Sequence, residues 1–178
     1  MHKILIKKYC FINSFEPNLI KNKDKNTIII YRNYTKNDLT EIIAIRNFCK
    51  KNKYRFLLSN NIKLALQLDL NGAYIPSFNQ KYDHLSYSFK KKFILIGSAH
   101  NLREITVKEK QKVTRIFLSS LFKENENYLG MNRFKILSTY SKNKFIALGG
   151  LNKKNLKKLH LLNIKGFAGI DFFKKKGP

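Results

Sequence analysis

Short apolar runs alternate along this chain with longer segments in which apolar residues recur every three or four positions. Unbroken runs of Ile, Leu, Phe and Ala are typical of strands buried on both faces of a parallel sheet, whereas the longer spacing favours amphipathic helices. The predicted strands cover residues 8–13, 27–34, 54–58, 72–75, 93–96, 115–118, 145–148 and 166–170.

Helical segments fill most of the intervals between these strands. Asp38 is placed to cap a helix through about residue 51, and further helices are expected after Asn61, around Leu102 and after Gly130. The first interval, 15–26, is barely long enough for a crossover, so we expect only a shortened first helix. Eight strands alternating with helices predict a single domain over 1–178, folded as an α/β (β/α)8 TIM barrel.

The segment from 145 to 170 forms one complete strand, helix and strand unit. Its first strand stops at Gly149-Gly150, after which Asn152 can cap a helix that extends to about Leu162. Glycines let an anion approach backbone N–H groups, and a helix N-terminus adds favourable partial charge. The turn is therefore a candidate phosphate site, and the alternative interpretation is that the two glycines only make a tight connection.

The chain ends soon after the last predicted strand. Only eight residues follow Ile170, so the outer helix that normally follows strand eight of a barrel is expected to be missing or a single turn. Apolar surface would then remain beside the first and last strands. A homodimer partner could cover it, or the chain could be incomplete.

Charge is strongly unbalanced, with 36 basic against 11 acidic residues and a formal net charge of +25. Such an excess suggests nucleic acid or an anionic membrane as a partner. Lysines are spread over nearly every predicted helix and loop, so we interpret them as solvated faces and consider nucleic acid unlikely. The charge would still attract phosphorylated small molecules.

Compartment signals point to the cytoplasm. Lys7 and Lys8 interrupt the N-terminal apolar run, which argues against an export signal, and no run approaches the about 18 apolar residues of a membrane span. We therefore expect no membrane partner. Cys10 and Cys49 lack metal-ligand spacing and are expected to be free thiols.

Two short motifs carry a family resemblance: Gly-Ser-Ala-His at 97–100 and Ala-Leu-Gly-Gly-Leu at 147–151. With the strand order from about residue 8 to 173, they make the chain resemble the thiamine-phosphate synthase and thiazole tautomerase (TenI-like) family. The resemblance implies a site at the C-terminal ends of the strands, with phosphate held by the last two loops. It assigns that role to the positions Gly149, Gly150, Ile170 and Asp171.

The synthases join two phosphorylated substrates. An aminopyrimidine methyl pyrophosphate loses pyrophosphate with help from Mg²⁺, and the nitrogen of a thiazole phosphate attacks the resulting cation. The resemblance therefore implies Mg²⁺ as cofactor and a phosphorylated thiazole or pyrimidine as ligand. Amides stand at the two metal-carboxylate positions, Asn60 and Asn79, so we expect the metal ligands to be lost, although Asp83 lies near the second position in sequence.

Further family positions also differ. Of the family's Gln-x-Arg-x-Lys after the second strand only Arg32 is kept, and two glutamates within 124–127 align with a phosphate-binding Thr-x-Thr-Lys segment. Carboxylates there would repel a phosphate, as would Asp171 in place of the family's Ser. The catalytic His of the tautomerases is replaced by Ser119-Ser120.

Arg32 and Ser98 remain as catalytic candidates. A cation at the end of a barrel strand suits an oxyanion, with an ion pair inside the barrel as the alternative. Ser98 aligns with a substrate-contacting position, and capping of the next helix is equally compatible. His100 is expected to pack in the first turn of that helix, and His84 to be exposed.

Two functional hypotheses follow from these residues. The first is a divergent transferase of thiamine biosynthesis that releases pyrophosphate, or an enzyme of the tautomerase type. The second is a non-catalytic relative that binds a phosphorylated ligand or a partner protein. Whether the chain is an enzyme is left open by the sequence.

Overall fold

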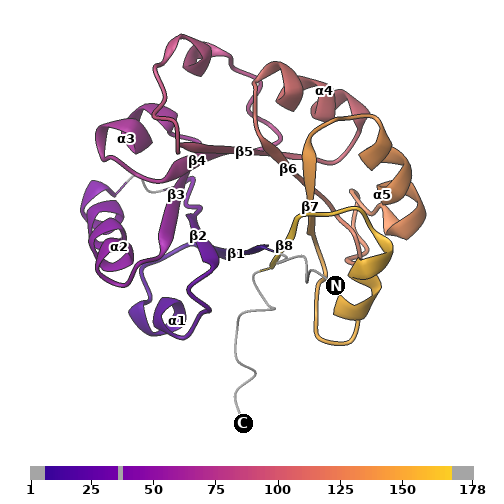
Figure 1. Ribbon diagram of the computed structural model, residues 1–178, viewed down its shortest axis with the longest axis horizontal. Coiled ribbons are helices and arrows are strands. Elements are labelled where there is room, and N and C mark those ends of the chain that lie inside the picture. The colour runs from indigo at the N-terminus through magenta and orange to yellow at the C-terminus, as the bar shows by residue number, and fades with distance from the viewer. Residues whose placement is uncertain (1–6, 36–37, 170–178) are drawn as a thin grey trace.

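A closed barrel of eight parallel strands forms the centre of the computed structural model, which describes residues 7–35 and 38–169 (Figure 1). Each strand pairs with its neighbours in chain order, and β8 closes the ring against β1. The predicted TIM barrel is confirmed. The strands are β1 Lys7–Ile12, β2 Thr27–Tyr31, β3 Arg55–Ser59, β4 Gly72–Ile75, β5 Ile94–Ala99, β6 Arg115–Leu118, β7 Lys144–Leu148 and β8 Gly166–Gly169.

Helices surround this ring on its outside. They are α1 Pro17–Lys21, α2 Leu39–Lys51, α3 Ile62–Gln67, α4 Leu102–Lys110 and α5 Gly130–Thr139, with 3-10 helices η1 Asp83–Ser86 and η2 Leu156–Leu161. Side-chain oxygens of Asp38, Asn61 and Asn101 accept hydrogen bonds from first-turn N–H groups of α2, α3 and α4. The shortened first helix is confirmed, and the segment after β8 lies outside the described residues.

The prediction of a helix after β7 is wrong in type and length. Only the 3-10 helix η2 forms there, and it follows a turn in which the Asn152 side chain accepts hydrogen bonds from the N–H groups of Lys154 and Asn155. The leucines that recur at every third position of this segment face the core: Leu159 and Leu162 are buried, and Leu156 is partly buried. The regular helix N-terminus that the sequence placed beside Gly149-Gly150 is therefore absent from this described segment.

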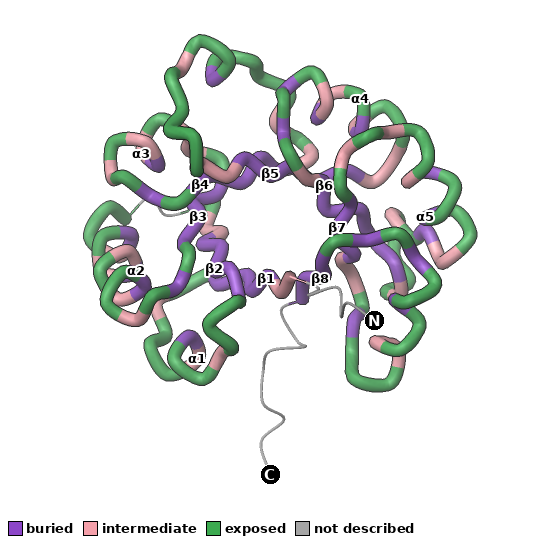
Figure 2. The backbone as a smooth tube through the Cα atoms, viewed as in Figure 1, coloured by how far each residue is buried: buried purple, intermediate pink, exposed green. Residues whose placement is uncertain are grey.

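Large side chains fill the barrel interior, and the strands form a ring of buried residues in Figure 2. The rings of Tyr9, Phe11, Tyr74 and Phe117 contact one another with centroids 5.2–5.7 Å apart. Such contacts stabilise beyond simple area burial. The barrel centre is thus a packed core that supports chemistry at its ends.

A second core lies between the strands and the outer helices. Cys10 and Cys49 belong to it as free thiols, as expected, and burial raises their pKa values to about 11 and about 12. Both thiols therefore stay protonated near neutral pH. Across the described ranges, no helix has the length and apolarity needed to cross a bilayer.

Candidate functional site

Arg32 directly follows β2 at the mouth of the barrel, by which we mean the C-terminal ends of the strands. Its backbone N–H donates to the carbonyl of Ile12, which continues the pairing of β1 and β2. Its side chain is half-buried, and the guanidinium carbon lies 5.1 Å from the centroid of the Phe11 ring. No carboxylate within 4.0 Å pairs with Arg32 among the described residues, so its charge can meet a ligand.

Ser98 lies inside β5, and its expected role as a possible helix cap is wrong. The strand continues to Ala99, and α4 is capped instead by Asn101. The buried Ser98 hydroxyl oxygen accepts a hydrogen bond from the Tyr74 hydroxyl at 2.8 Å. Burial raises the pKa of Tyr74 far above its ordinary value, so this hydroxyl remains a donor.

The fold brings Arg32 and Ser98 to one wall of the mouth. Arg32 lies over Phe11, the Phe11 and Tyr74 rings are 5.4 Å apart, and Tyr74 binds Ser98. Burial is the main cause of the raised pKa of Tyr74, and the positive charge of Arg32 acts in the opposite direction, so the two groups lie within electrostatic reach.

Tyr34 and Ser59 extend this wall, and sequence reasoning missed them together with Tyr74. The Ser59 hydroxyl donates to the Tyr34 hydroxyl at 3.2 Å, and Arg32 acts electrostatically on Tyr34. We call these polar groups, Arg32, Tyr34, Ser59, Tyr74 and Ser98, the mouth cluster. The alternation of side chains along each strand could have identified Ser59 and Tyr74, because it puts both on the inward face of the barrel.

Asn60 and Asn79, at which the resemblance places the family's metal carboxylates, are bonded to each other. The Asn79 side-chain N–H donates to the Asn60 side-chain oxygen at 2.7 Å. Mg²⁺ prefers carboxylates and other free oxygens, whereas here one amide oxygen is already used and one group is a donor. No group of three His, Cys, Asp or Glu side chains within the described ranges could hold a metal ion. The described residues do not fit the magnesium site that the family implies.

A cavity of about 400 Å³ opens beside this amide pair, between the loop after β3 and the loop after β4. Asp83 lines it, exposed to solvent, while Asn60 and Asn79 belong to its wall. The carboxylate of Asp83 has no described basic partner within ion-pair distance. A single exposed carboxylate does not rebuild a magnesium site.

Lys108 of α4 donates hydrogen bonds to the loop after β4. Its ammonium is fully buried and donates to the carbonyls of Pro76 and Asn79 and to the Gln111 side-chain oxygen, at 2.7, 2.7 and 2.9 Å. Burial lowers the pKa of Lys108 to about 8, against a weaker upward effect of Glu104. This lysine was not singled out from the sequence, because its neighbours mark α4 as an ordinary surface helix.

His84 is buried at 4 % exposure, so the expectation of an exposed side chain is wrong. Its Nε2 atom lies 2.9 Å from the Gln111 carbonyl oxygen, and Gln111 in turn donates to the carbonyls of Asn79 and Lys81. The residues after β4 are thus fixed to the end of α4 by His84, Lys108 and Gln111. The polar composition of 77–92 had suggested a solvated loop.

Both glycines of the turn after β7 have left-handed backbone angles, with φ of +98° at Gly149 and +70° at Gly150. A β-carbon on Gly149 would lie 2.4 Å from the Ser120 hydroxyl oxygen, and one on Gly150 would lie 2.4 Å from the Lys123 nitrogen. The carbonyl oxygens of Leu148 and Gly149 accept N–H groups from the loop after β6. Close packing of two loops therefore accounts for both glycines without a ligand, and a phosphate role stays a prediction.

In the loop after β6, the two serines are buried and the two glutamates are exposed. Ser119 and Ser120 are buried, and His100 reaches Ser119 with its Nδ1 atom 2.9 Å from the carbonyl oxygen. Glu124 and Glu126 are exposed and lie beyond the 120–123 stretch that packs on the glycines. Ile170 and Asp171 lie outside the described residues, so their predicted phosphate role is not tested.

A closed barrel of eight parallel strands with helices around it defines the class of (β/α)8 barrels, and the mouth cluster lies at the C-terminal ends of its strands. The family model described as thiamine monophosphate synthase matches residues 18–172. The chain belongs to this family, which confirms the resemblance.

Curated relatives agree with this assignment. The chain is 27% identical over 176 residues to a thiamine-phosphate synthase of Prochlorococcus marinus, covering 92% of this chain and 51% of that protein. It is 26% identical over 142 residues to that of Persephonella marina, covering 73% and 66%. The chain thus spans from about half to two thirds of the length of these two relatives.

Solved structures show the same fold. A thiamine phosphate pyrophosphorylase from Pyrococcus furiosus superposes with a TM-score of 0.75 at 17% identity, covering 96% of this chain and 89% of that one. The corresponding protein from Bacteroides thetaiotaomicron gives 0.64 at 15% identity, covering 94% and 84%.

Proposed function

We propose that this thiamine-phosphate synthase-like protein binds a phosphorylated thiazole or pyrimidine at the mouth of its barrel. The observation that carries the proposal is the continuous wall from Arg32 over Phe11 and Tyr74 to Ser98. A half-buried guanidinium without a described carboxylate partner suits a phosphate, and the exposed ring of Tyr34, within electrostatic reach of Arg32, suits a planar ring.

The mouth cluster offers hydrogen bonds of defined direction. Because the Ser98 oxygen accepts from Tyr74, its own hydrogen can be donated to a ligand oxygen. Tyr34 is arranged similarly, since its oxygen accepts from Ser59. The backbone N–H groups of the Gly149-Gly150 turn would supply the second set of donors, at the end of β7 across the ring (Figure 1).

The Asn60–Asn79 amide pair supports a protein that binds its ligand but does not join two substrates with the help of magnesium. Asn60 and Asn79 satisfy each other, so the departure of pyrophosphate would lack the carboxylate-held cation that the family's chemistry requires. Titration calorimetry with thiazole phosphate tests the binding. We expect Arg32→Met to weaken affinity about tenfold or more, and Lys21→Met, an exposed residue of equal charge, to leave it unchanged. Equal affinities for all three proteins would refute the proposal.

Catalytic joining is the second candidate, favoured by the family match over 18–172. Purified protein is mixed with the aminopyrimidine pyrophosphate, thiazole phosphate and Mg²⁺, and thiamine phosphate is quantified. We expect no product above a blank without protein. Product that scales with protein concentration would replace the binding-only assignment with a transferase.

A further inference from the structure

Four basic residues begin strands at the end of the barrel opposite the mouth. They are Lys7 of β1, Arg55 of β3, Arg115 of β6 and Lys144 of β7. Each stands two residues before a side chain of the interior core, namely Tyr9, Leu57, Phe117 and Ile146. Because side chains alternate along a strand, all four point to the inner side of the ring. We call these four residues the basic floor.

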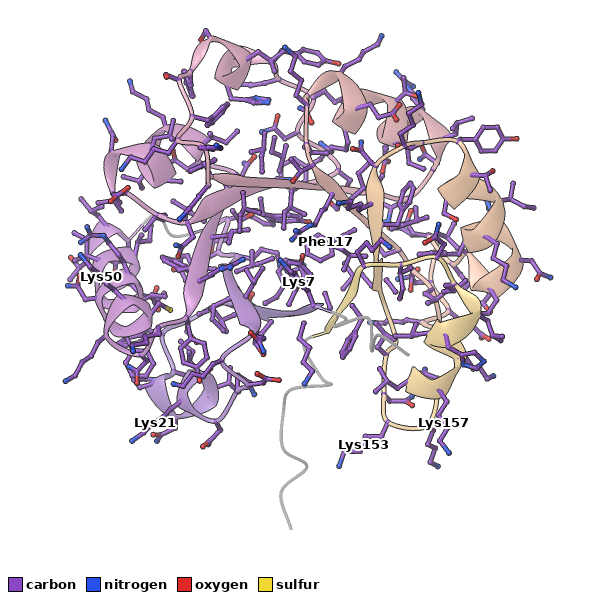
Figure 3. The ribbon with its side chains drawn as sticks, in the orientation of Figure 1. Lys7, Lys21, Lys50, Phe117, Lys153 and Lys157 are labelled. Carbon is purple, nitrogen blue, oxygen red and sulfur yellow. The ribbon has the colours of Figure 1, made fainter. Side chains whose placement is uncertain are left out.

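The position of Lys7 is unlike that of other lysines. Figure 3 shows Lys7 and Phe117 within the ring of strands. Four other labelled lysines lie around the outside of the ring: Lys21, Lys50, Lys153 and Lys157. Lys7 and Arg115 are half-buried, and Arg55 and Lys144 are exposed at the rim. The charges of the floor therefore face one central region.

Contacts show how closely these groups approach. Arg115 and Lys144 are directly paired across β6 and β7. The Arg115 guanidinium donates to the Tyr9 hydroxyl at 2.7 Å, reaching from β6 to the strand that begins with Lys7. Burial lowers the pKa of Lys7, and repulsion from Arg115, Arg55 and Lys144 lowers it further.

No described carboxylate neutralises the floor. The ion pairs found in residues 7–35 and 38–169 join Lys8 to Asp24 and Lys90 to Asp69, and neither includes a floor residue. Residues 1–6, which precede Lys7 in sequence, contain no Asp or Glu. The fully buried Tyr9 hydroxyl accepts from Arg115, and its own hydrogen has no acceptor in the described part of the chain. The mutually repelling cations of the basic floor and the Tyr9 hydroxyl thus lie in one region that no described carboxylate neutralises.

We infer that the basic floor is a binding site for a compact phosphate-class anion with two or more negative charges. Arg115, held by its hydrogen bond to the Tyr9 hydroxyl, would act as the inner donor, and Lys7, Lys144 and Arg55 would surround the anion. The site is separate from the mouth, because Arg32 follows the C-terminal end of β2 whereas the floor lies at the N-terminal ends. Charges that converge on one point fit a compact anion better than a nucleic acid, which needs cations along a line.

Calorimetry with inorganic phosphate and with tripolyphosphate at fixed ionic strength tests this site. We expect Arg115→Met/Lys144→Met to weaken tripolyphosphate binding about tenfold or more. Lys50→Met/Lys153→Met, which removes the same charge from the outside of the ring, should change it less than about twofold. Arg32→Met, at the other end of the barrel, should retain the binding.

Three results would overturn the inference. Equal losses of tripolyphosphate affinity in the two double variants would show an effect of net charge. A loss of affinity in Arg32→Met alone would place the anion at the mouth. Floor-dependent binding of duplex DNA without tripolyphosphate binding would identify a polymer ligand. Thermal unfolding checks the fold of each variant, and exposed Lys144→Met alone serves if the double variant does not fold. Tripolyphosphate should raise the Tm of the parent protein more than that of either floor variant.

Discussion

The side-chain amide of Asn79 donates a hydrogen bond to the side-chain oxygen of Asn60 across 2.7 Å. This bond joins the loop after β3 to the loop after β4 at the mouth of the barrel. Two carboxylates at the same separation would repel each other unless a cation lay between them. The two amides therefore connect the loops without a cation between them.

Asn60→Asp/Asn79→Asp should create a dependence on divalent cations. Without a metal, we expect the two carboxylates to lower the Tm, and added Mg²⁺ should restore it, while the parent protein should not respond. Thermal unfolding with and without Mg²⁺ measures this. Asn18→Asp/Asn163→Asp changes the charge equally at exposed positions and should show no magnesium response. A magnesium-stabilised parent protein would contradict the prediction.

Lys108 should make stability rise with pH. Its pKa is lowered from 10.5 to about 8 in the folded protein, so between these values the unfolded chain holds a proton that the folded chain has released. The free energy of unfolding should therefore increase from about pH 8 to about pH 10.5, by at most about 3 kcal/mol from this group.

Urea unfolding of the parent protein and of Lys108→Met across this pH range isolates that contribution. Other titrations, including those of buried tyrosines, are common to both proteins and cancel in the difference. Lys110→Met, on the same helix but exposed, should follow the parent curve. Parallel curves for the parent and Lys108→Met would show that Lys108 does not titrate in this range.

Gly150→Ala should be considerably more destabilising than Gly130→Ala. Both positions have positive φ, at +70° and +64°, but a β-carbon meets the Lys123 backbone at 2.4 Å in the first and only the Tyr128 side chain at 3.3 Å in the second. We expect losses of about 2–4 kcal/mol and about 1 kcal/mol in the free energy of unfolding. Chemical denaturation measures both. Similar losses would mean that the loop after β6 moves aside.

Tyr74→Phe and Ser98→Ala should have coupled effects. Each removes one partner of a buried 2.8 Å hydrogen bond, so we expect each to cost about 1 kcal/mol of stability. The double variant should lose less than the sum, because no unpaired group is then left behind. Additive losses in urea unfolding would show that the bond contributes little.

The sequence predicted the strands and the barrel, because buried parallel strands have a composition that needs no long-range information, and it predicted the family through the motifs at 97–100 and 147–151. It also marked the caps Asp38 and Asn61, whose side chains act within their own first turn. It failed at η2, where the apolar spacing indicated a regular helix and the structure has a short 3-10 helix.

Only the tertiary structure decided which polar side chains meet. Arg32 and Ser98 lie on different strands, and their connection through Phe11 and Tyr74 depends on strand register and the inward face. The same holds for the Asn60–Asn79 bond and for the convergence of Lys7 and Arg115 inside the ring. Residues far apart in sequence become neighbours through barrel closure, a global property that local patterns do not encode.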